Sequence, residues 1–249
     1  MRKRDILPAL AVGLGLWQAL VWITGAPHFI LPSPLRVANA LIHSREVIAE
    51  NALVTLQEII AGLILGTLLG VATAIQLTLS KTAERLMLPI LVFTQAVPVF
   101  ALAPVLTLWF GYGMASKIVM TVLIIYFPVT SAFHDGLTRV DRGLLDQAKI
   151  MGARPLQTLL RIQVPHALPS LGTGLRLAAV YAPIGAVIGE WVGASKGLGY
   201  LMLLANGRAK IDLMFASLIV LACLTVLLHT AIGVLSRQLV AYSEGRRLR

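Results

Sequence analysis

The sequence predicts an all-α, polytopic membrane protein with six transmembrane helices and a helical loop on the cytoplasmic side. The prediction rests on composition, on the length of the apolar segments and on the lack of alternating, strand-like patterns. Hydrophobic residues make up 57% of the 249 residues, and charged residues only 13%. A soluble domain carries about 25% charged residues. Half that share cannot cover a surface exposed to water, so much of the surface must face lipid.

A helix needs about 20 mostly apolar residues to cross the hydrocarbon core of a membrane. Six segments meet this requirement. They run over residues 6–23, 54–77, 86–109, 118–133, 171–189 and 213–235. Neither an internal repeat nor a low-complexity tract divides the chain, and we therefore expect one transmembrane domain over residues 1–249.

The first segment also resembles a secretory signal, because Arg2, Lys3 and Arg4 precede it. Its apolar stretch is longer than a usual signal core, however, and Thr24-Gly25-Ala26 is only a loose match to a cleavage site. We therefore expect the segment to stay in the protein as the first membrane helix.

Lysine and arginine residues between the segments predict the orientation, since they favour the cytoplasmic side. With a cytoplasmic amino terminus, fourteen lie inside: Arg2, Lys3, Arg4, Lys81, Arg85, Arg139, Arg142, Lys149, Arg154, Arg161, Arg237, Arg246, Arg247 and Arg249. Six lie outside: Arg36, Arg45, Lys117, Lys196, Arg208 and Lys210. The excess places both termini and the loop 134–170 in the cytoplasm. It also explains the net charge of +10 without a nucleic acid partner.

The outer loop 25–50 contains Leu31-Pro32-Ser33-Pro34, which cannot continue a helix because proline lacks an N–H and restricts the residue before it. Apolar residues spaced among polar ones follow. We expect this stretch to form either a helix lying on the membrane surface or a plain connecting helix.

The loop 134–170 contains two amphipathic stretches. The first, residues 140–151, has an apolar set at helical spacing opposite a charged set: Leu144, Leu145, Ala148 and Met151 against Arg142, Asp146 and Lys149. Gly152 suits a helix end, and Pro155 suits the first turn of a second short helix. We expect Pro165 and Pro169 to end that helix, which gives a compact knob outside the membrane.

This knob resembles the EAA loop of ABC importer permeases, which docks on the ATPase subunit and passes ATP-driven movement to the transmembrane helices. An acid, an alanine, a glycine and an Ile-x-apolar-Pro sequence occur at the family's spacing. The docking residues that the resemblance implies are Asp146, Gln147, Ala148, Gly152, Ala153, Arg154, Ile162 and Pro165. The family usually has Glu-Ala-Ala at the first three positions, so here the acid is one methylene shorter and the first alanine is replaced. An ordinary amphipathic loop is the alternative.

Three other short segments resemble those of the nitrate/sulfonate/taurine-type importer permeases. They are Leu31-Pro32-Ser33-Pro34, residues 108–113 (Leu-Trp-Phe-Gly-Tyr-Gly) and residues 193–200 (Gly-Ala-Ser-Lys-Gly-Leu-Gly-Tyr). Residues 93–98 and 182–193 are similar to the branch for thiamine pyrimidine precursors such as hydroxymethylpyrimidine. The resemblance implies a homodimer in the bacterial cytoplasmic (inner) membrane. It also implies two cytoplasmic ABC ATPase subunits, which bind the ATP, and an extracytoplasmic substrate-binding protein. Sulfonate, taurine, nitrate or another small organic solute is the alternative cargo.

Polar and helix-breaking residues within the apolar segments predict a translocation path, because charges and free backbone groups are costly inside a membrane. Gln95 and Pro98 lie in the third segment. Pro183 lies in the fifth, and Glu190 follows its end. We expect these two helices to border a path between the two copies. Alternatively, the prolines only shape helix packing, and Glu190 lies at the membrane interface beside Trp191.

The sequence lacks the motifs of an enzyme or a metal site. It has no Gly-x-x-x-x-Gly-Lys-Ser/Thr phosphate loop, no His-Glu-x-x-His and no Gly-x-Ser-x-Gly. We therefore expect no catalytic residues, no metal and no cofactor in this chain, and we interpret His134 and Asp135 as a helix end facing water. A gradient-driven secondary transporter is the rival class, but the segments carry almost no ionisable residues and no repeat.

Overall fold

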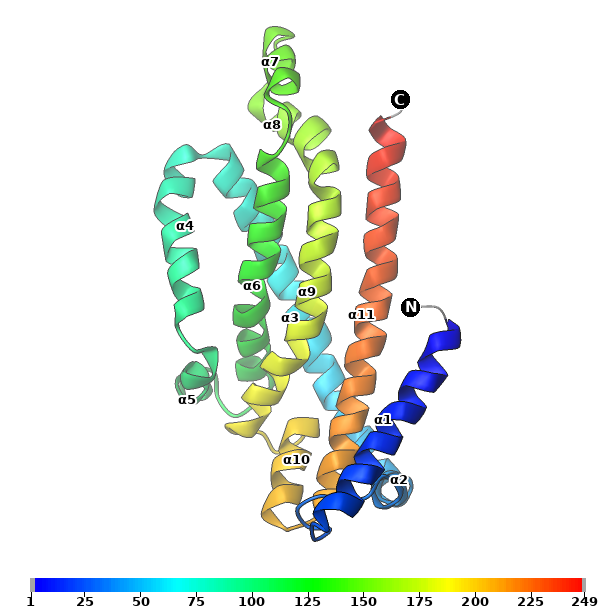
Figure 1. The fold of residues 1–249 in the computed structure, drawn as a ribbon. Coiled ribbons are helices and arrows are strands. Elements are labelled where there is room, and N and C mark those ends of the chain that lie inside the picture. Colours follow the sequence, from blue (N-terminus) through cyan, green and yellow to red (C-terminus); the bar gives the residue numbers. More distant parts are fainter. Residues whose placement is uncertain (1–2, 248–249) are drawn as a thin grey trace. The chain divides into compact units, whose positions relative to one another are not determined.

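The computed structural model describes residues 3–247, and these residues are all-α, without a β-strand (Figure 1). Their elements are α1 (Lys3–Thr24), α2 (Pro34–His43), α3 (Arg45–Leu79), α4 (Lys81–Ala96), α5 (Val99–Phe110), α6 (Met114–Thr138), α7 (Arg142–Ile150), α8 (Pro155–Thr158), the π-helix η1 (Leu159–Gln163), α9 (Val164–Trp191), α10 (Leu198–Gly207) and α11 (Ile211–Arg247). The predicted cytoplasmic charges Arg2 and Arg249 lie outside the described residues.

The helices belong to two compact units. The first unit holds Met1–Thr55 and Ser195–Cys223, and the second holds Leu56–Ala194 and Leu224–Arg249. The division falls within α3 and α11, so each unit contains part of both helices.

Four of the six predicted membrane segments are confirmed as helices that are long and apolar enough to span a membrane. They are α3, α6, α11 and the continuous helix Pro155–Trp191, which α8, η1 and α9 form together. The first segment forms α1, whose apolar part Ala11–Thr24 is shorter than a full span, so its membrane crossing stays a prediction. The helix α10 was not expected from the sequence.

The third predicted segment, 86–109, is not one straight helix. It consists of α4 and α5, which are bent by 100° at the break between them. Pro98 accounts for the break, because its ring disfavours a helical conformation at Val97, and Val97 is extended with ψ of 120°. Pro104 lies within α5 without breaking it. By length and composition, the described residues thus supply four candidate spans, or five if the bent pair is one broken span.

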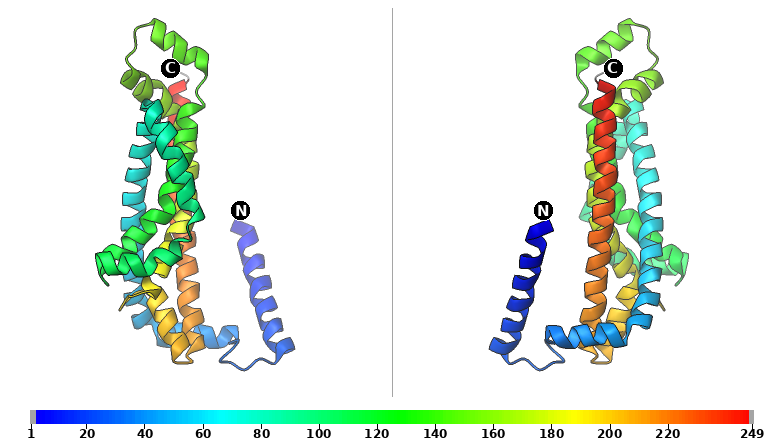
Figure 2. Two further views of the ribbon diagram at one scale, coloured as in Figure 1. Left: turned by 90° about the vertical axis from the view of Figure 1, so that its left-hand side faces the viewer. Right: turned by 90° about the vertical axis from the view of Figure 1, so that its right-hand side faces the viewer.

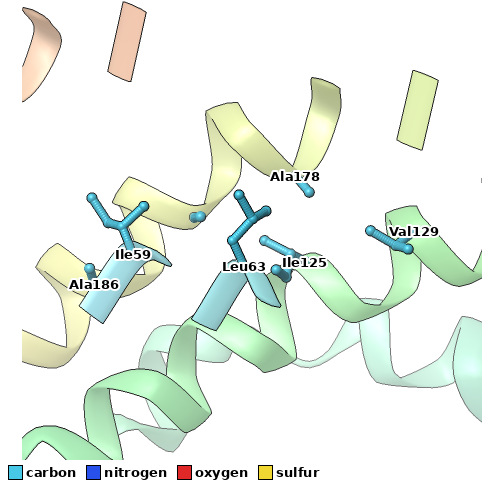
Figure 3. Packing of buried hydrophobic residues seen from close by; sticks show 7 residues of the cluster. Ile59, Leu63, Ile125, Val129, Ala178 and Ala186 are labelled. Atoms are coloured by element: carbon cyan, nitrogen blue, oxygen red, sulfur yellow. The ribbon is translucent and has the colours of Figure 1, made fainter. Parts of the chain in front are cut away.

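The core of the second unit lies where α3, α6 and α9 meet. Small and branched apolar side chains from the three helices fill it: Ile59, Leu63, Ile125, Val129, Ala178, Ala182 and Ala186 (Figure 3). The three alanines are completely buried and recur at every fourth position of α9. Such a stripe of small residues lets helix backbones approach closely and pack by van der Waals contact.

Glycines mark the closest approaches between these helices. Gly62, Gly66 and Gly70 recur at every fourth position of α3, and a Cβ atom added to any of them would lie within 3.0 Å of an α6 side chain. On α9, a Cβ atom at Gly185 would lie 2.7 Å from the Cα atom of Thr121 in α6. The three helices therefore pack at distances that only glycine permits at these positions.

Within the second unit, α6 and α9 run side by side, and α7 and α8 lie beyond one shared end of this pair (Figure 1). The views from both sides show the same arrangement (Figure 2). The helix α5 lies toward the opposite end. The predicted docking loop and the loop between α5 and α6 are therefore at opposite ends of the second unit.

In the first unit, side chains of α3 cap the amino end of α10. The N–H of Gly197 donates to Oδ1 of Asn51, and the N–H of Leu198 donates to Oγ1 of Thr55, both at 2.7 Å. Asn51 and Thr55 are buried. These bonds satisfy two helix-end donors that have no partner within α10 itself.

The same unit joins α1 and α2 to the first turns of α11. The Trp17 ring of α1 stacks on Phe215 at a centroid distance of 5.8 Å. In α2, Arg36 forms an ion pair with Asp212 at 3.0 Å. The helix predicted after Leu31-Pro32-Ser33-Pro34 is confirmed as α2, with Pro34 in its first turn.

Candidate functional site

The loop between α6 and α9 begins with a capped helix. Asp141 is the N-cap residue of α7, and its Oδ1 accepts a hydrogen bond from the N–H of Gly143 at 2.7 Å. Three of the predicted docking residues lie on α7. Asp146 and Gln147 are exposed, whereas Ala148 is buried. The helix therefore presents its acid and its amide outward and packs through the alanine.

Gly152 ends this helix, as the sequence predicts. Its φ of +77° lies in the left-handed region that glycine favours. The N–H of Gly152 donates to the carbonyl of Lys149 at 3.0 Å, and the N–H of Ala153 donates to that of Ala148 at 2.9 Å. The two bonds form a Schellman motif, which satisfies carbonyls at the helix end. The motif fixes the direction in which the chain leaves α7 toward Arg154.

The second helix of the loop does not end before the fifth segment, contrary to the prediction. Pro155 starts α8, as expected, but α8 continues through η1 into α9. At the end of η1 the N–H of Val164 donates to the carbonyl of Leu159, five residues earlier. This wider turn comes directly before Pro165, which has no N–H to donate, so the chain passes the proline without breaking. Pro169 likewise lies inside α9.

The loop exposes a set of large apolar side chains: Leu144, Ile150, Met151, Leu156 and Leu160. Ile150 and Met151 are each 86% exposed. Among the other residues predicted to dock, Arg154 is exposed beside them, while Ile162 in η1 is half-buried and Pro165 is buried. Apolar side chains gathered on a projecting loop are typical of a surface that a partner covers.

The residues predicted to border the translocation path fall into two pairs. Gln95 lies in the last turn of α4 and Pro98 at the bend, and both are exposed in this chain. Pro183 and Glu190 are buried within α9. The first pair is thus open to a partner or to solvent, and the second faces the interior of the second unit.

Glu190 belongs to a buried group of charges that the sequence analysis did not identify. Glu58 of α3, Lys117 of α6 and Glu190 are each 1–2% exposed. The two carboxyl groups share a hydrogen bond, and Lys117 interacts electrostatically with both of them. Three ionisable groups from three helices therefore meet in the interior of the second unit.

Lys117 also joins two loops at this place. Its Nζ donates to the carbonyls of Tyr112 and Gly113, at 2.5 and 2.9 Å, and to that of Gly193, at 3.2 Å. A Cβ atom on Gly193 would lie 2.6 Å from the Tyr112 ring. The ammonium group thus fastens the loop before α6 to the loop after α9. Lys117 is not the exposed charge of an outer loop that its place in the sequence suggested.

One sequence signal pointed to this cluster. Glu58 is an acidic residue within the predicted segment 54–77, and an ionisable residue inside a membrane segment usually has a buried partner. His134, expected to face water at a helix end, is also buried, with 6% exposure. Polar contacts with α3 and α4 hold the His134 side chain inside. Such contacts join different helices, so the pattern of a single segment could not predict them.

A family model described as "Binding-protein-dependent transport system inner membrane component" matches residues 62–241. The chain belongs to this family. The matched residues include the whole α6–α9 loop and two of the three buried charges, Lys117 and Glu190. The chain is therefore the permease subunit of an ABC importer, a multi-pass protein of the inner membrane in a family of transport subunits.

Alignments with similar permeases extend over nearly the whole chain. This chain is 50% identical to a "Probable ABC transporter permease protein" of Haemophilus influenzae, over 93% of this chain and 96% of the relative. It is 37% identical to the formylaminopyrimidine transport permease ThiX of Halalkalibacterium halodurans, over 92% of each chain. It is 36% identical to the riboflavin transport permease RibX of Chloroflexus aurantiacus, over 92% of this chain and 86% of the relative.

Permeases of the sulfonate and taurine type are similar as well. The putative aliphatic sulfonates permease SsuC of Bacillus subtilis is 29% identical, over 96% of this chain and 87% of the relative. The taurine permease TauC of Escherichia coli is 28% identical, over 94% and 87%. The resemblance to this type of importer permease, noted from short strings, is thus confirmed along the chain.

The fold of the permease also matches a solved structure. A chain of the MetNI methionine ABC transporter, in an inward-facing conformation, superposes with a TM-score of 0.69 over 79% of this chain and 97% of that chain. The sequences are 20% identical, so the match concerns the fold.

Proposed function

We propose that the permease forms the translocation path of an importer as a homodimer, with two cytoplasmic ATPase subunits and an extracytoplasmic binding protein. In this proposal α1 and the bent α4–α5 pair also cross the membrane, which gives six segments with both termini in the cytoplasm. The excess of basic residues on the loop side supports this orientation.

The observation that carries the coupling role is the shape and surface of the α6–α9 loop. The Schellman motif at Gly152 and the N-cap at Asp141 make α7 rigid. The helix from Pro155 continues without interruption into α9. A force applied to the exposed apolar residues of the loop, such as Ile150 and Met151, is therefore passed directly to a helix of the core.

The proposed solute is a thiamine pyrimidine precursor such as hydroxymethylpyrimidine. Residues 93–98 and 182–193 support this choice by their similarity to that branch. Two relatives above 35% identity are named for formylaminopyrimidine and riboflavin, both of which contain a nitrogen heterocycle. Those named for sulfonates and taurine are 29% and 28% identical. Sulfonates, taurine and nitrate are the alternative solutes.

Uptake of labelled hydroxymethylpyrimidine tests the solute. The permease, its ATPase and its binding protein are produced together in cells that do not take up the pyrimidine themselves. We expect ATP-dependent accumulation that unlabelled hydroxymethylpyrimidine or formylaminopyrimidine blocks and that taurine does not. Accumulation of taurine or riboflavin alone would replace the proposed solute and leave the permease assignment intact.

Gly152→Asp tests the coupling loop. At a φ of +77° most side chains are strained by about 1–2 kcal/mol, asparagine and aspartate less so, and the aspartate also adds charge beside the exposed apolar residues. We expect uptake to fall about tenfold or more, which corresponds to about 1.4 kcal/mol of lost docking energy. Gly152→Asn is the matched control, because asparagine has the same size, tolerates the left-handed region and is neutral. It should lose less activity, whereas normal uptake with Gly152→Asp would refute the docking role.

Co-purification separates this proposal from a gradient-driven transporter. An ABC permease extracted in mild detergent should carry a soluble ATPase subunit with it, and its uptake should stop when ATP is depleted and the proton gradient is kept. Uptake that follows the gradient, without an associated ATPase, would favour the secondary transporter.

A further inference from the structure

The carboxyl end of α6 is fastened to the helix that leaves the coupling loop. Nε2 of Gln163, in η1, donates to the carbonyl of Leu137 at 3.1 Å. Leu137 is completely buried. One residue earlier, a Cβ atom on Gly136 would lie 2.7 Å from the Cβ atom of Ser170 in α9. The end of α6 therefore has no room to slide past η1 and α9, and it must follow them when the loop moves.

One turn before Leu137, His134 connects α6 to two further helices. Its Nδ1 lies 3.3 Å from Oγ1 of Thr78 at the end of α3, and its Nε2 lies 3.3 Å from Oε1 of Glu84 in α4. The His134 side chain is 7% exposed and that of Glu84 is 44% exposed. The histidine is thus a buried contact between α6 and the first turn of α4, and its partner lies at the surface.

Beyond this contact α4 does not pack tightly against α6. A cavity of about 130 Å³ lies between the helices. Its lining includes Leu77 of α3, Leu88, Leu91 and Val92 of α4, and Phe127 and His134 of α6. Close-packed interiors resist movement, whereas a void leaves neighbouring atoms free to shift. The helix α4 is therefore held at its first turn and has space to tilt further along, toward the bend at Pro98.

We propose that Gln163, Leu137, His134 and Glu84 form a mechanical link that carries movement of the coupling loop to α4 and, through the bend, to α5. The proposal rests on the coupling role of the loop proposed above. In this link His134 is a positioning residue, because it transmits a displacement and touches neither ATP nor solute. The moving wall of the path is then the α4–α5 pair, while α3, α6 and α9 stay packed together.

The first test follows α4 itself and needs no solute. Thr94, exposed in the last turn of α4, is replaced by cysteine in a Cys223→Ser background. The complete complex with its ATPase is placed in liposomes, and labelling by a water-soluble maleimide is compared with and without ATP and vanadate. We expect the labelling rate to change about fivefold or more on trapping, since coupling between distant sites usually amounts to about 5–150-fold. His134→Leu, which keeps bulk and removes both polar contacts, should abolish most of that change.

Matched variants identify the link. Gln163→Met should reduce the ATP-dependent labelling change as His134→Leu does. Gln238 is an exposed glutamine of α11, and Gln238→Met should leave the labelling change as in the parent. When His134→Leu is combined with Glu84→Ala, the loss of the ATP-dependent labelling change should be no greater than in either single variant, because both substitutions interrupt the same connection. His134→Gln should recover part of the change, since its amide still reaches Glu84. A purely structural role for His134 would predict loss of the assembled complex instead.

The outcomes separate this link from the coupling proposal. If Gly152→Asp loses the bound ATPase while His134→Leu keeps it and loses the movement of α4, both proposals are supported. If Gly152→Asp remains fully coupled, the docking role of the loop fails. If the loop docks but α4 labelling does not respond to ATP, or responds equally in His134→Leu, the mechanical link is wrong.

Discussion

Lys117→Met is expected to destabilise the permease more than any other single charge removal. Methionine keeps most of the length of the side chain but leaves Glu58 and Glu190 buried without their cation. Removing one partner of a buried ion pair costs about 3–5 kcal/mol. The three carbonyl contacts that join the loops before α6 and after α9 are lost as well. The measurement is the fraction of assembled complex that survives a series of heating steps, read by size-exclusion chromatography.

Two further variants show whether charge causes the loss. Lys196→Met removes an exposed lysine and should leave the heating curve unchanged. Lys117→Met combined with Glu190→Gln lowers the number of unpaired acids and should recover part of the stability. If the double variant is as unstable as Lys117→Met, the carbonyl contacts matter and the charges do not. A Lys117→Met protein as stable as the parent would disprove a stabilising role for Lys117.

Gly185→Leu is expected to prevent assembly of the permease. The first carbon of the new side chain would lie 2.7 Å from the Cα atom and 3.2 Å from the backbone nitrogen of Thr121. A backbone cannot rotate aside as a side chain can, so α6 and α9 would have to separate, and overpacking of a core costs about 1–3 kcal/mol or more. The yield of monodisperse protein in detergent measures the effect.

Gly13→Leu is the control for this substitution, because nothing lies within 4 Å of a Cβ atom at Gly13 in α1. Both changes add the same apolar side chain to a helical glycine. Equal yields for the two variants would show that the contact between α6 and α9 is looser than the structure has it.

Apolar length predicted the helices that run through the second unit. The segments 54–77, 118–133 and 171–189 each lie inside a longer helix, because the polar residues at their ends still suit a helical backbone. Gly152 was predicted as a helix end, since a left-handed residue after a periodic stretch has few alternatives to glycine.

The errors came from prolines and from partners that are distant in sequence. Hydropathy treats 86–109 as one segment, although Pro98 bends it. The prolines Pro165 and Pro169 predicted a stop, although a π-turn carries the helix past Pro165. Whether a proline breaks a helix depends on what can replace its missing hydrogen bond, which is decided by tertiary packing. Lys117 was assigned to a loop because its partners, Glu58 and Glu190, lie far from it in the chain.

The bend at Pro98 has a consequence for hydration. The last four carbonyl groups of a helix have no partner within it, and a proline following the helix supplies no N–H. Hydrocarbon cannot satisfy such groups, and irregular backbone at membrane depth is tolerated only beside protein or water. If the α4–α5 pair crosses the membrane, lipid tails must therefore be absent from its bend. That point must then lie against water or against the second copy of the permease.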